Sequence, residues 1–258
     1  MEERENKFIH KNPKSFVSAG DMGDVIYHLL YIKILGGEKY HLIPGGQNYI
    51  RDGYIQCGDG SPPKFNLDSA LFLLPLLREQ KYLKDVDLYS EDPKDAWKFY
   101  DVHVGEFHKD DLGMQNLTDF HAKKYELPLQ LLNDPWLEVE NSRKFDNSRD
   151  TVINRTLRYR GNDNFYFFNR EKLNQKAIFV GISEEYMEFV RRFQCPDIPF
   201  VKTDTALELA EIINGHPNFV GNGSLAASIA TGLGVNMHYE FCHTACHYAL
   251  ERSNLNYF

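Results

Sequence analysis

The chain has 258 residues, of which 42% are hydrophobic and 14% aromatic, so it can bury one large core or two smaller ones and is not mainly disordered. No run approaches the roughly eighteen apolar residues that a membrane span needs, and the charged first residues do not resemble a secretory signal. The formal net charge of −8 argues against a surface that binds nucleic acid over its whole extent, because phosphate binding relies on clustered Lys and Arg.

The cysteine content points to a reducing compartment. The four cysteines, Cys57, Cys195, Cys242 and Cys246, are too few for a disulfide scaffold in a chain of this length. We therefore expect buried thiols and a cytoplasmic protein.

The first half of the chain alternates between strand and helix patterns. A short apolar strand over 15–20 leads through the turn DMGDV into an apolar-periodic helix that ends at Gly36 and Gly37. Three further elements follow: a strand over 39–46, a helix over 66–80 capped by Asn66 or Asp68, and a strand over 86–90. This alternation indicates a parallel sheet.

The pattern weakens between 92 and 132, where only 116–127 is predicted to be helical. The segment 133–150 is polar, contains Pro135 and has the composition of a linker. We place a domain boundary there, which divides the chain into 1–140 and 141–258. The arginine-rich stretch over 143–170 is expected to continue the linker with a solvated face.

The second half restarts the alternation. The expected strands are 151–156, 176–181, 198–202 and 218–222. The expected helices are 183–193 capped by Ser183, 205–216 capped by Thr203 or Asp204, 224–234, and a final helix over 242–253. Two successive Rossmann-like halves are the simplest interpretation.

The turn SAGDMGDV near the start joins a strand directly to a helix. This arrangement brings backbone N–H groups and the positive end of the helix to the carboxyl edge of the sheet, where open α/β folds bind ligands. The spacing is not G-x-G-x-x-G, which argues against a dinucleotide site. By the residues alone, Asp24 is a helix-start carboxylate favoured by the dipole and Asp21 is a turn residue.

A second turn, NFVGNGSLAAS, again joins a strand to a helix start. It predicts an anion site with side-chain donors from Asn222 and Ser224, although Ser224 would also serve as an ordinary N-cap. Between the two turns, Arg155, Thr156 and Arg158 follow the first strand of the second half. Guanidinium groups there suit a diphosphate, and the alternative is a surface salt bridge.

The order of these strings resembles glycosyltransferase family 9, the bacterial heptosyltransferases and their relatives, and in particular short glycosyltransferase-like proteins of bacteria and their phages. The first turn is similar to the loop that opens the first long helix of that family, and the second to its donor-diphosphate turn. The chain departs from the family in Gly223, where Asp is common, and in Ser228, where His often follows. These departures leave the sugar open.

The resemblance implies a GT-B fold, in which two Rossmann-like domains face each other across a cleft and a C-terminal helix closes the molecule. It makes Asp24 the catalytic base and places Asp21 and Met22 on the acceptor side. The implied donor-binding residues are Gly23, Arg155, Thr156, Arg158, Gly181, Glu185, Asn222, Gly223, Ser224 and Leu225.

We therefore expect a glycosyltransferase that moves a sugar from a nucleotide-diphosphate sugar to a hydroxyl of a bacterial glycan, without metal or other cofactor and with inversion. One alternative is a phage enzyme acting on 5-hydroxymethyl pyrimidines in DNA. Others are a non-catalytic nucleotide-sugar binding protein and a Rossmann oxidoreductase. A zinc site formed by Cys242, His243, Cys246 and His247 is possible by spacing, but a closing helix explains that pattern as well.

Overall fold

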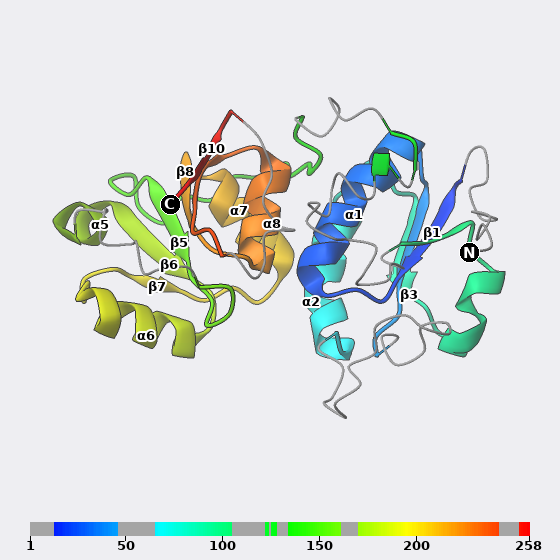
Figure 1. Ribbon diagram of the computed structural model, residues 1–258, viewed down its shortest axis with the longest axis horizontal. Helices are drawn as coiled ribbons and strands as arrows, with labels where there is room; N and C mark the ends of the chain where they lie inside the picture. The colour runs from blue at the N-terminus through cyan, green and yellow to red at the C-terminus, as the bar shows by residue number, and fades with distance from the viewer. Residues whose placement is uncertain are drawn as a thin grey trace, which may run out of the picture.

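The protein is an α/β structure with two parallel sheets that lie side by side (Figure 1). The computed structural model describes residues 13–45, 65–104, 122–123, 125–127, 134–160, 170–242 and 253–258. The helices and strands given below belong to these ranges. Among the described residues, no helix has the length and apolar character that crossing a membrane requires.

The first sheet has four strands in the order β3-β2-β1-β4, all parallel. The strands are β1 (Ser15–Ser18), β2 (Lys39–Leu42), β3 (Asp85–Leu88) and β4 (Val102–Val104). A short 3-10 helix, η2 (Pro93–Lys98), precedes β4. The sequence did not predict η2 or β4, because both lie where the periodic pattern weakens.

Helices α1 (Met22–Leu35) and α2 (Leu67–Arg78) connect the strands of this sheet. Helix α1 ends as expected at Gly36, which adopts the left-handed conformation that glycine permits at φ +71°. Of the two predicted caps of α2, the structure selects Asn66, whose side chain accepts from the N–H of Ser69.

The second sheet has six parallel strands in the order β10-β9-β8-β5-β6-β7. They are β5 (Thr151–Asn154), β6 (Ala177–Val180), β7 (Phe200–Val201), β8 (Asn218–Gly221), β9 (Asn236–Tyr239) and β10 (Leu255–Tyr257). Counted from β5, this is the strand order of a complete Rossmann fold. The order reverses between β5 and β8, and such a switch point is where open parallel sheets bind ligands.

Four helices accompany the second sheet: α5 (Arg170–Lys176), α6 (Ser183–Phe193), α7 (Ala206–Asn214) and α8 (Leu225–Leu233). Two predicted caps were wrong by one or two residues. Helix α6 is preceded by Ile182, whose N–H donates to Glu185 Oε2 at 3.4 Å, so Ser183 is already helical. Helix α7 is capped by Thr205, whose side chain accepts from the N–H of Glu208.

The two sheets are joined through their helices, since α1 packs on α8 and α2 on α7 (Figure 1). One apolar cluster runs through all four helices and includes residues of both sheets. The fully buried Ile26 of α1 and Ile229 of α8 are members. One continuous core therefore lies between the two sheets, and two smaller apolar clusters are separate from it.

The predicted linker is partly an ordered strap. Residues 140–148 are exposed, as expected, but Trp136 and Leu137 are buried. The indole N–H of Trp136 donates to the carbonyl of Ile26 in α1 at 3.0 Å. The backbone N–H groups of Trp136 and Leu137 both donate to the carbonyl of Gly232 in α8. The strap thus fastens α1 to α8.

The end of the chain differs from the expectation. The predicted closing helix over 242–253 falls mostly outside the described residues. The structure instead shows β9 and β10, two strands that the sequence did not predict, with β10 at the edge of the second sheet.

Candidate functional site

The two glycine-bearing turns meet at one place between the sheets. A Cβ added to Gly23 at the start of α1 would lie 3.0 Å from the Ser228 hydroxyl in the first turns of α8. The amino-terminal ends of both helices therefore face the same region, and both direct the positive end of a helix dipole to it. The switch point between β5 and β8 opens onto the same region.

Two hollows occupy this region. The smaller, which we call the Asp24 recess, has a volume of about 30 Å³ and lies between the first turn and Gly223, Ser224 and Tyr239. That volume holds a water molecule or two. The larger, which we call the main cavity, measures about 410 Å³ and reaches from Met22 and Phe72 to Glu185 at the start of α6. Its size is that of a ligand site.

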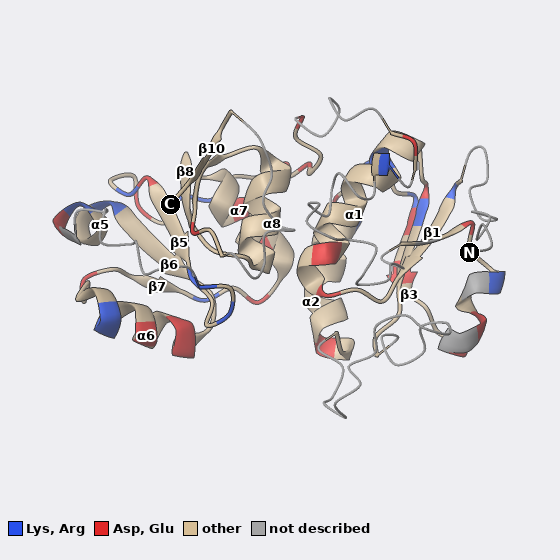
Figure 2. Cartoon of the chain, viewed as in Figure 1, with Lys and Arg blue, Asp and Glu red and all other residues tan. Residues whose placement is uncertain are grey.

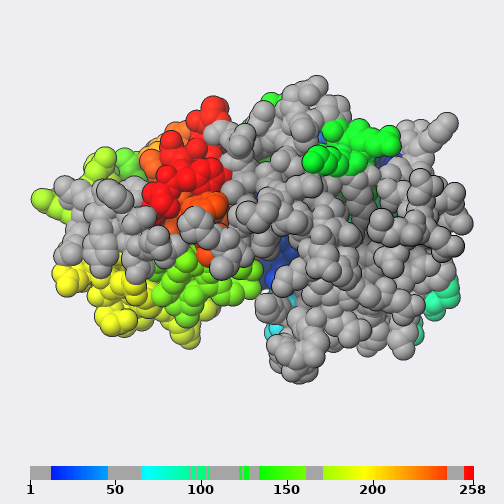
Figure 3. Space-filling model, viewed as in Figure 1, coloured from blue at the N-terminus to red at the C-terminus, as the bar shows by residue number. Residues whose placement is uncertain are grey.

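Most of the residues predicted from the sequence line one hollow or both. Asp21, Gly23, Asp24 and Gly223 line the Asp24 recess, whereas Met22, Thr156, Gly181 and Glu185 line the main cavity. Arg158, Ser224 and Leu225 line both. Figure 3 shows a small patch of blue atoms of the N-terminal half beside yellow-green atoms of the second half.

Asp24 has the electrostatics of a proton acceptor that works near neutral pH. Burial raises its pKa to about 7, and repulsion from Asp21 acts in the same direction. A backbone hydrogen bond at Asp21 and the positive charge of Arg158 oppose the rise. A carboxyl group with this pKa exists in both protonation states at neutral pH, which suits a general base.

Arg158 lies between the two hollows. The segment after β5 that carries it faces the acidic first turns of α1 and α2 across the region between the sheets (Figure 2). Its charge lowers the pKa of both Asp24 and Glu185, so it acts on both hollows. Its guanidinium also lies 5.2 Å from the centre of the Tyr159 ring.

Arg155 does not reach either hollow. Its side chain is fully buried, and its Nε and Nη2 donate to the two carboxylate oxygens of Glu240 at 2.7 and 2.8 Å. The predicted phosphate contact at Arg155 therefore disagrees with this geometry. The predicted alternative, a surface salt bridge, is wrong as well, because the pair is buried. No local pattern points to this ion pair, since Glu240 lies 85 residues from Arg155 along the chain.

Asn222 also serves a different purpose from the one expected. It is fully buried, its Oδ1 accepts from the N–H of Thr156 at 2.9 Å, and its Nδ2 donates to the carbonyl of Arg158 at 2.7 Å. Its side chain thus fastens the segment after β5 to the turn after β8. The Ser224 side chain accepts from the N–H of Ala227, as an N-cap does. Gly223, Ser224 and Leu225 of the second turn line one or both hollows.

The turn after β6 forms the far wall of the main cavity. Gly181 adopts φ +141°, and a Cβ there would lie 2.8 Å from both Asn154 Nδ2 and Glu185 Oε2. Only glycine fits this backbone and this space. Burial raises the pKa of Glu185, which is held by the N–H of Ile182. The wall therefore presents a carboxylate beside a glycine at the carboxyl end of a strand.

The sequence missed the aromatic walls of the Asp24 recess. Tyr27, Tyr159 and Tyr239 all line it. Tyr27 stands one turn after Asp24 on α1, so a helical projection would have found it. Tyr159 and Tyr239 come from loops and strands whose meeting depends on the fold. The ring of Tyr159 would be 3.0 Å from a Cβ at Gly223, so it occupies the space that a side chain at position 223 would need.

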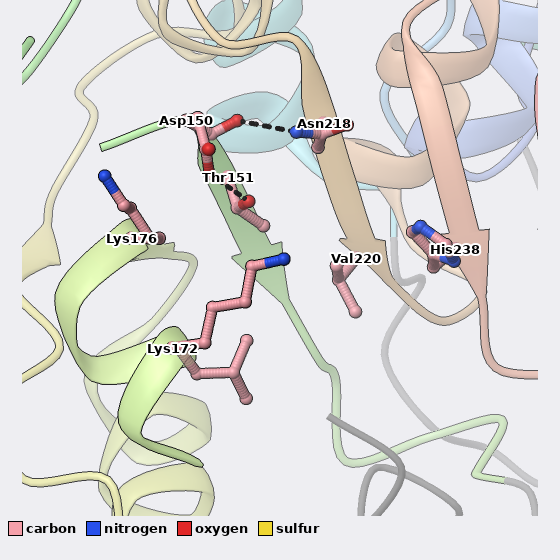
Figure 4. A pocket seen from close by; sticks show the side chains of 8 residues that line it. Asp150, Thr151, Lys172, Lys176, Asn218, Val220 and His238 are labelled. Carbon is pink, nitrogen blue, oxygen red and sulfur yellow. Dashed lines mark hydrogen bonds between the residues drawn. The ribbon is translucent and has the colours of Figure 1, made fainter. Parts of the chain in front are cut away.

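A third hollow, of about 170 Å³, lies away from these residues (Figure 4). Its walls include Thr151 and Asn218, the first residues of β5 and β8, and Lys172 reaches toward these strands from α5. It is therefore at the opposite end of the strands from the switch point.

Within the ranges that the structure describes, no group of three or more His, Cys, Asp or Glu side chains is arranged to hold a metal ion. Cys242 is buried, whereas the other members of the predicted Cys/His cluster lie outside those ranges.

Comparison with known proteins gives structural matches alone. No protein-family model matches the chain, and no curated protein matches it in sequence. The glycosyl transferase family 9 protein from Veillonella parvula DSM 2008 superimposes with a TM-score of 0.53 at 10% identity, over 97% of this chain and 88% of that one.

The glycosyltransferase TibC from enterotoxigenic E. coli H10407, described as iron-containing and dodecameric, has a TM-score of 0.55 at 10% identity, over 95% of this chain and 62% of its own. TibC in complex with ADP-D-beta-D-heptose gives 0.54 at 9% identity, over 96% and 63%. The resemblance inferred from the sequence is confirmed at the level of the fold: this chain shares its architecture with the family 9 glycosyl transferase from Veillonella parvula and with the glycosyltransferase TibC.

Proposed function

We propose that this protein is a glycosyltransferase that moves a sugar from a nucleotide-diphosphate sugar to an acceptor hydroxyl. The observation that carries the proposal is the position of Asp24. A carboxyl group with a pKa of about 7 lies where two helix amino termini and Arg158 meet, in a recess that shares Arg158, Ser224 and Leu225 with a cavity of ligand size. A base beside an anion site is what transfer from a sugar diphosphate needs.

In the proposed reaction Asp24 accepts the proton of the acceptor hydroxyl as its oxygen attacks the anomeric carbon, and the bond from that carbon to the diphosphate breaks with inversion. Arg158 and the backbone N–H groups at the start of α8 stabilise the departing diphosphate. Thr156 and Gly223 shape the same end of the site. Charge neutralisation by these protein groups is the basis for proposing transfer without a metal ion.

The nucleoside is proposed to lie along the main cavity toward Gly181 and Glu185. Apolar side chains, among them Val180 and Leu225, line the space between, and the Glu185 carboxylate can accept hydrogen bonds from sugar hydroxyls. TibC, which shares the fold, was solved with ADP-D-beta-D-heptose, so an ADP-sugar is a reasonable first donor to test.

The acceptor is proposed to be a glycan. The formal net charge of −8 disfavours DNA as the acceptor, because binding of a phosphate backbone relies on clustered Lys and Arg. We also propose a GT-B arrangement with domains at 1–140 and 141–258, in which each sheet contributes one turn to the site. A cytoplasmic location, expected from the composition, is part of the same proposal.

The test replaces Asp24 with Asn and measures transfer and donor binding separately. We expect transfer to fall by about 10³-fold, because general base catalysis contributes about 10²–10⁴-fold. Donor binding should be almost unchanged, since Asn has the same shape. Wild-type transfer should rise with pH through about 7, as Asp24 ionises, and fall below it. Full activity of Asp24→Asn would contradict the assignment.

The stability of this variant is an internal control. The folded-state pKa of Asp24, about 7, is above its ordinary value of 3.8, so wild-type stability decreases as pH rises from 3.8 to 7. Asparagine does not ionise, and Asp24→Asn should therefore be at least as stable as wild type at pH 8. Loss of transfer in a folded, donor-binding variant then reports on chemistry. Asp21→Asn, the matched change in the same turn, should keep transfer.

A further inference from the structure

The three arginines that follow β5 have three different environments. Arg155 is buried against Glu240, and Arg158 lines both hollows. Arg160, two residues further on, forms an ion pair with Glu188 of α6. One segment therefore presents Arg158 to the site and fixes its neighbours on either side with carboxylates.

The backbone of this segment is strained. Tyr159 adopts φ +50°, a left-handed conformation that is uncommon for a bulky aromatic residue. Such a conformation persists when surrounding contacts impose it. Asn222 supplies some of these contacts, through the N–H of Thr156 and the carbonyl of Arg158. The Nε of Arg160 supplies another by donating to the Thr156 carbonyl at 3.2 Å.

Glu188 fixes Arg160 in this arrangement. Its Oε1 accepts from Arg160 Nη1 at 3.0 Å, and its Oε2 lies 3.0 Å from Arg160 Nη2 as a close ion-pair contact. Arg192 Nη1 and Arg155 Nη1 lie 3.6 and 3.9 Å from the same carboxylate. The side chain of Glu188 is only 18% exposed, which limits screening by solvent.

We propose that Glu188 is a positioning residue, which holds Arg160 and thereby the strained backbone that directs Arg158 toward the donor diphosphate. The proposal rests on the proposed function, because it gives Arg158 a diphosphate to bind. Glu188 itself does not line either hollow. Glu240 is less suitable as a test of the same idea, because removing one partner of a fully buried pair would disturb folding.

The first experiment compares Glu188→Gln with Glu184→Gln, the same change on an exposed residue of the same helix. Binding of ADP and of UDP is measured by calorimetry, together with the melting temperature. We expect Glu188→Gln to weaken binding of the preferred nucleotide by about tenfold, because it removes a charged partner of Arg160. Glu184→Gln should stay within about twofold of wild type.

A double-mutant cycle separates positioning from general loss of structure. If Glu188 acts through Arg158, Glu188→Gln should have no further effect on nucleotide binding in an Arg158→Ala background. Equal weakening in both backgrounds, or wild-type affinity of Glu188→Gln, would overturn the proposal. Arg160→Gln breaks the same link from the other side and should reproduce the tenfold loss if Glu188→Gln folds poorly.

Amide hydrogen exchange tests, without a ligand, whether Glu188 holds the segment that carries Arg158. In Glu188→Gln, exchange at Thr156 to Arg160 should accelerate while the strands of the second sheet keep their protection. Unchanged exchange in this segment would contradict the proposal. A wild-type protein that binds neither ADP nor UDP would contradict the proposed function instead, and hydrogen exchange would still decide whether Glu188 holds the segment.

Discussion

The two glycine-bearing turns have the same strand-to-helix construction, but their side chains differ in what they face. Each joins a parallel strand to a helix, β1 to α1 and β8 to α8, and each brings its helix start to the same region. In the first turn the side chain of Asp24 lines the recess. In the second, the side chains of Asn222 and Ser224 are bonded to the protein itself.

This difference shows how a pair of similar motifs can divide the work of one site. The first turn supplies a titratable side chain, and its backbone serves mainly to start a helix. In the proposed mechanism the second turn supplies backbone N–H groups, whereas its side chains stabilise the turn and the segment that carries Arg158. Side-chain substitutions should therefore affect chemistry in the first turn and structure in the second.

The largest effect expected in the second turn is that of Asn222→Ala. It would leave the Thr156 N–H and the Arg158 carbonyl without their buried partner, which should cost about 2–4 kcal/mol of unfolding free energy. Urea denaturation measures this loss. Nucleotide affinity should fall too, since Arg158 loses its support. A variant as stable as wild type would show that Asn222 does not fasten the segment.

Ser224→Ala should have a smaller and purely structural effect. It removes the cap on the Ala227 N–H at the start of α8, a loss of about 1 kcal/mol. Because the backbone N–H groups remain, nucleotide affinity measured at a temperature well below the melting point should stay close to that of wild type. A large loss of affinity with little loss of stability would instead indicate that the Ser224 hydroxyl contacts the ligand. The side chains of the second turn would then not be purely structural.

The smallest effect is expected for Asp21→Asn, and it tests the first turn. The Asp21 charge raises the pKa of Asp24, so its removal should lower that pKa. The acidic limb of the pH–rate profile would then move from near 7 to lower pH, with little change in the plateau rate. A shift to higher pH, or a lost plateau, would assign Asp21 a role beyond its charge.

The sequence allowed the two turns to be predicted because their signals are local. A glycine turn between an apolar strand and an apolar-periodic helix is visible in fewer than ten residues, and the resemblance then joined the two turns in one site. The caps at Ile182 and Thr205 were missed by one or two residues, a usual error for helix boundaries.

The pairing of charges could not be predicted in the same way. Arg155 and Arg158 follow the same strand, and nothing in the sequence distinguishes them. Glu240, at the end of the strand beside β8, forms a buried ion pair with Arg155 and leaves Arg158 as the cavity residue. Strands β9 and β10 were missed because they are short and gain their stability from pairing within the sheet.

The strap at Trp136 has a consequence for how the molecule unfolds. The indole ring is buried between helices that belong to different sheets, and a Cβ at Gly232 would lie only 2.7 Å from the Leu137 side chain. Neither half can keep its share of the apolar cluster without the other, since that cluster spans both. Although the topology divides into two halves, each with its own sheet, denaturant should unfold both in a single cooperative transition.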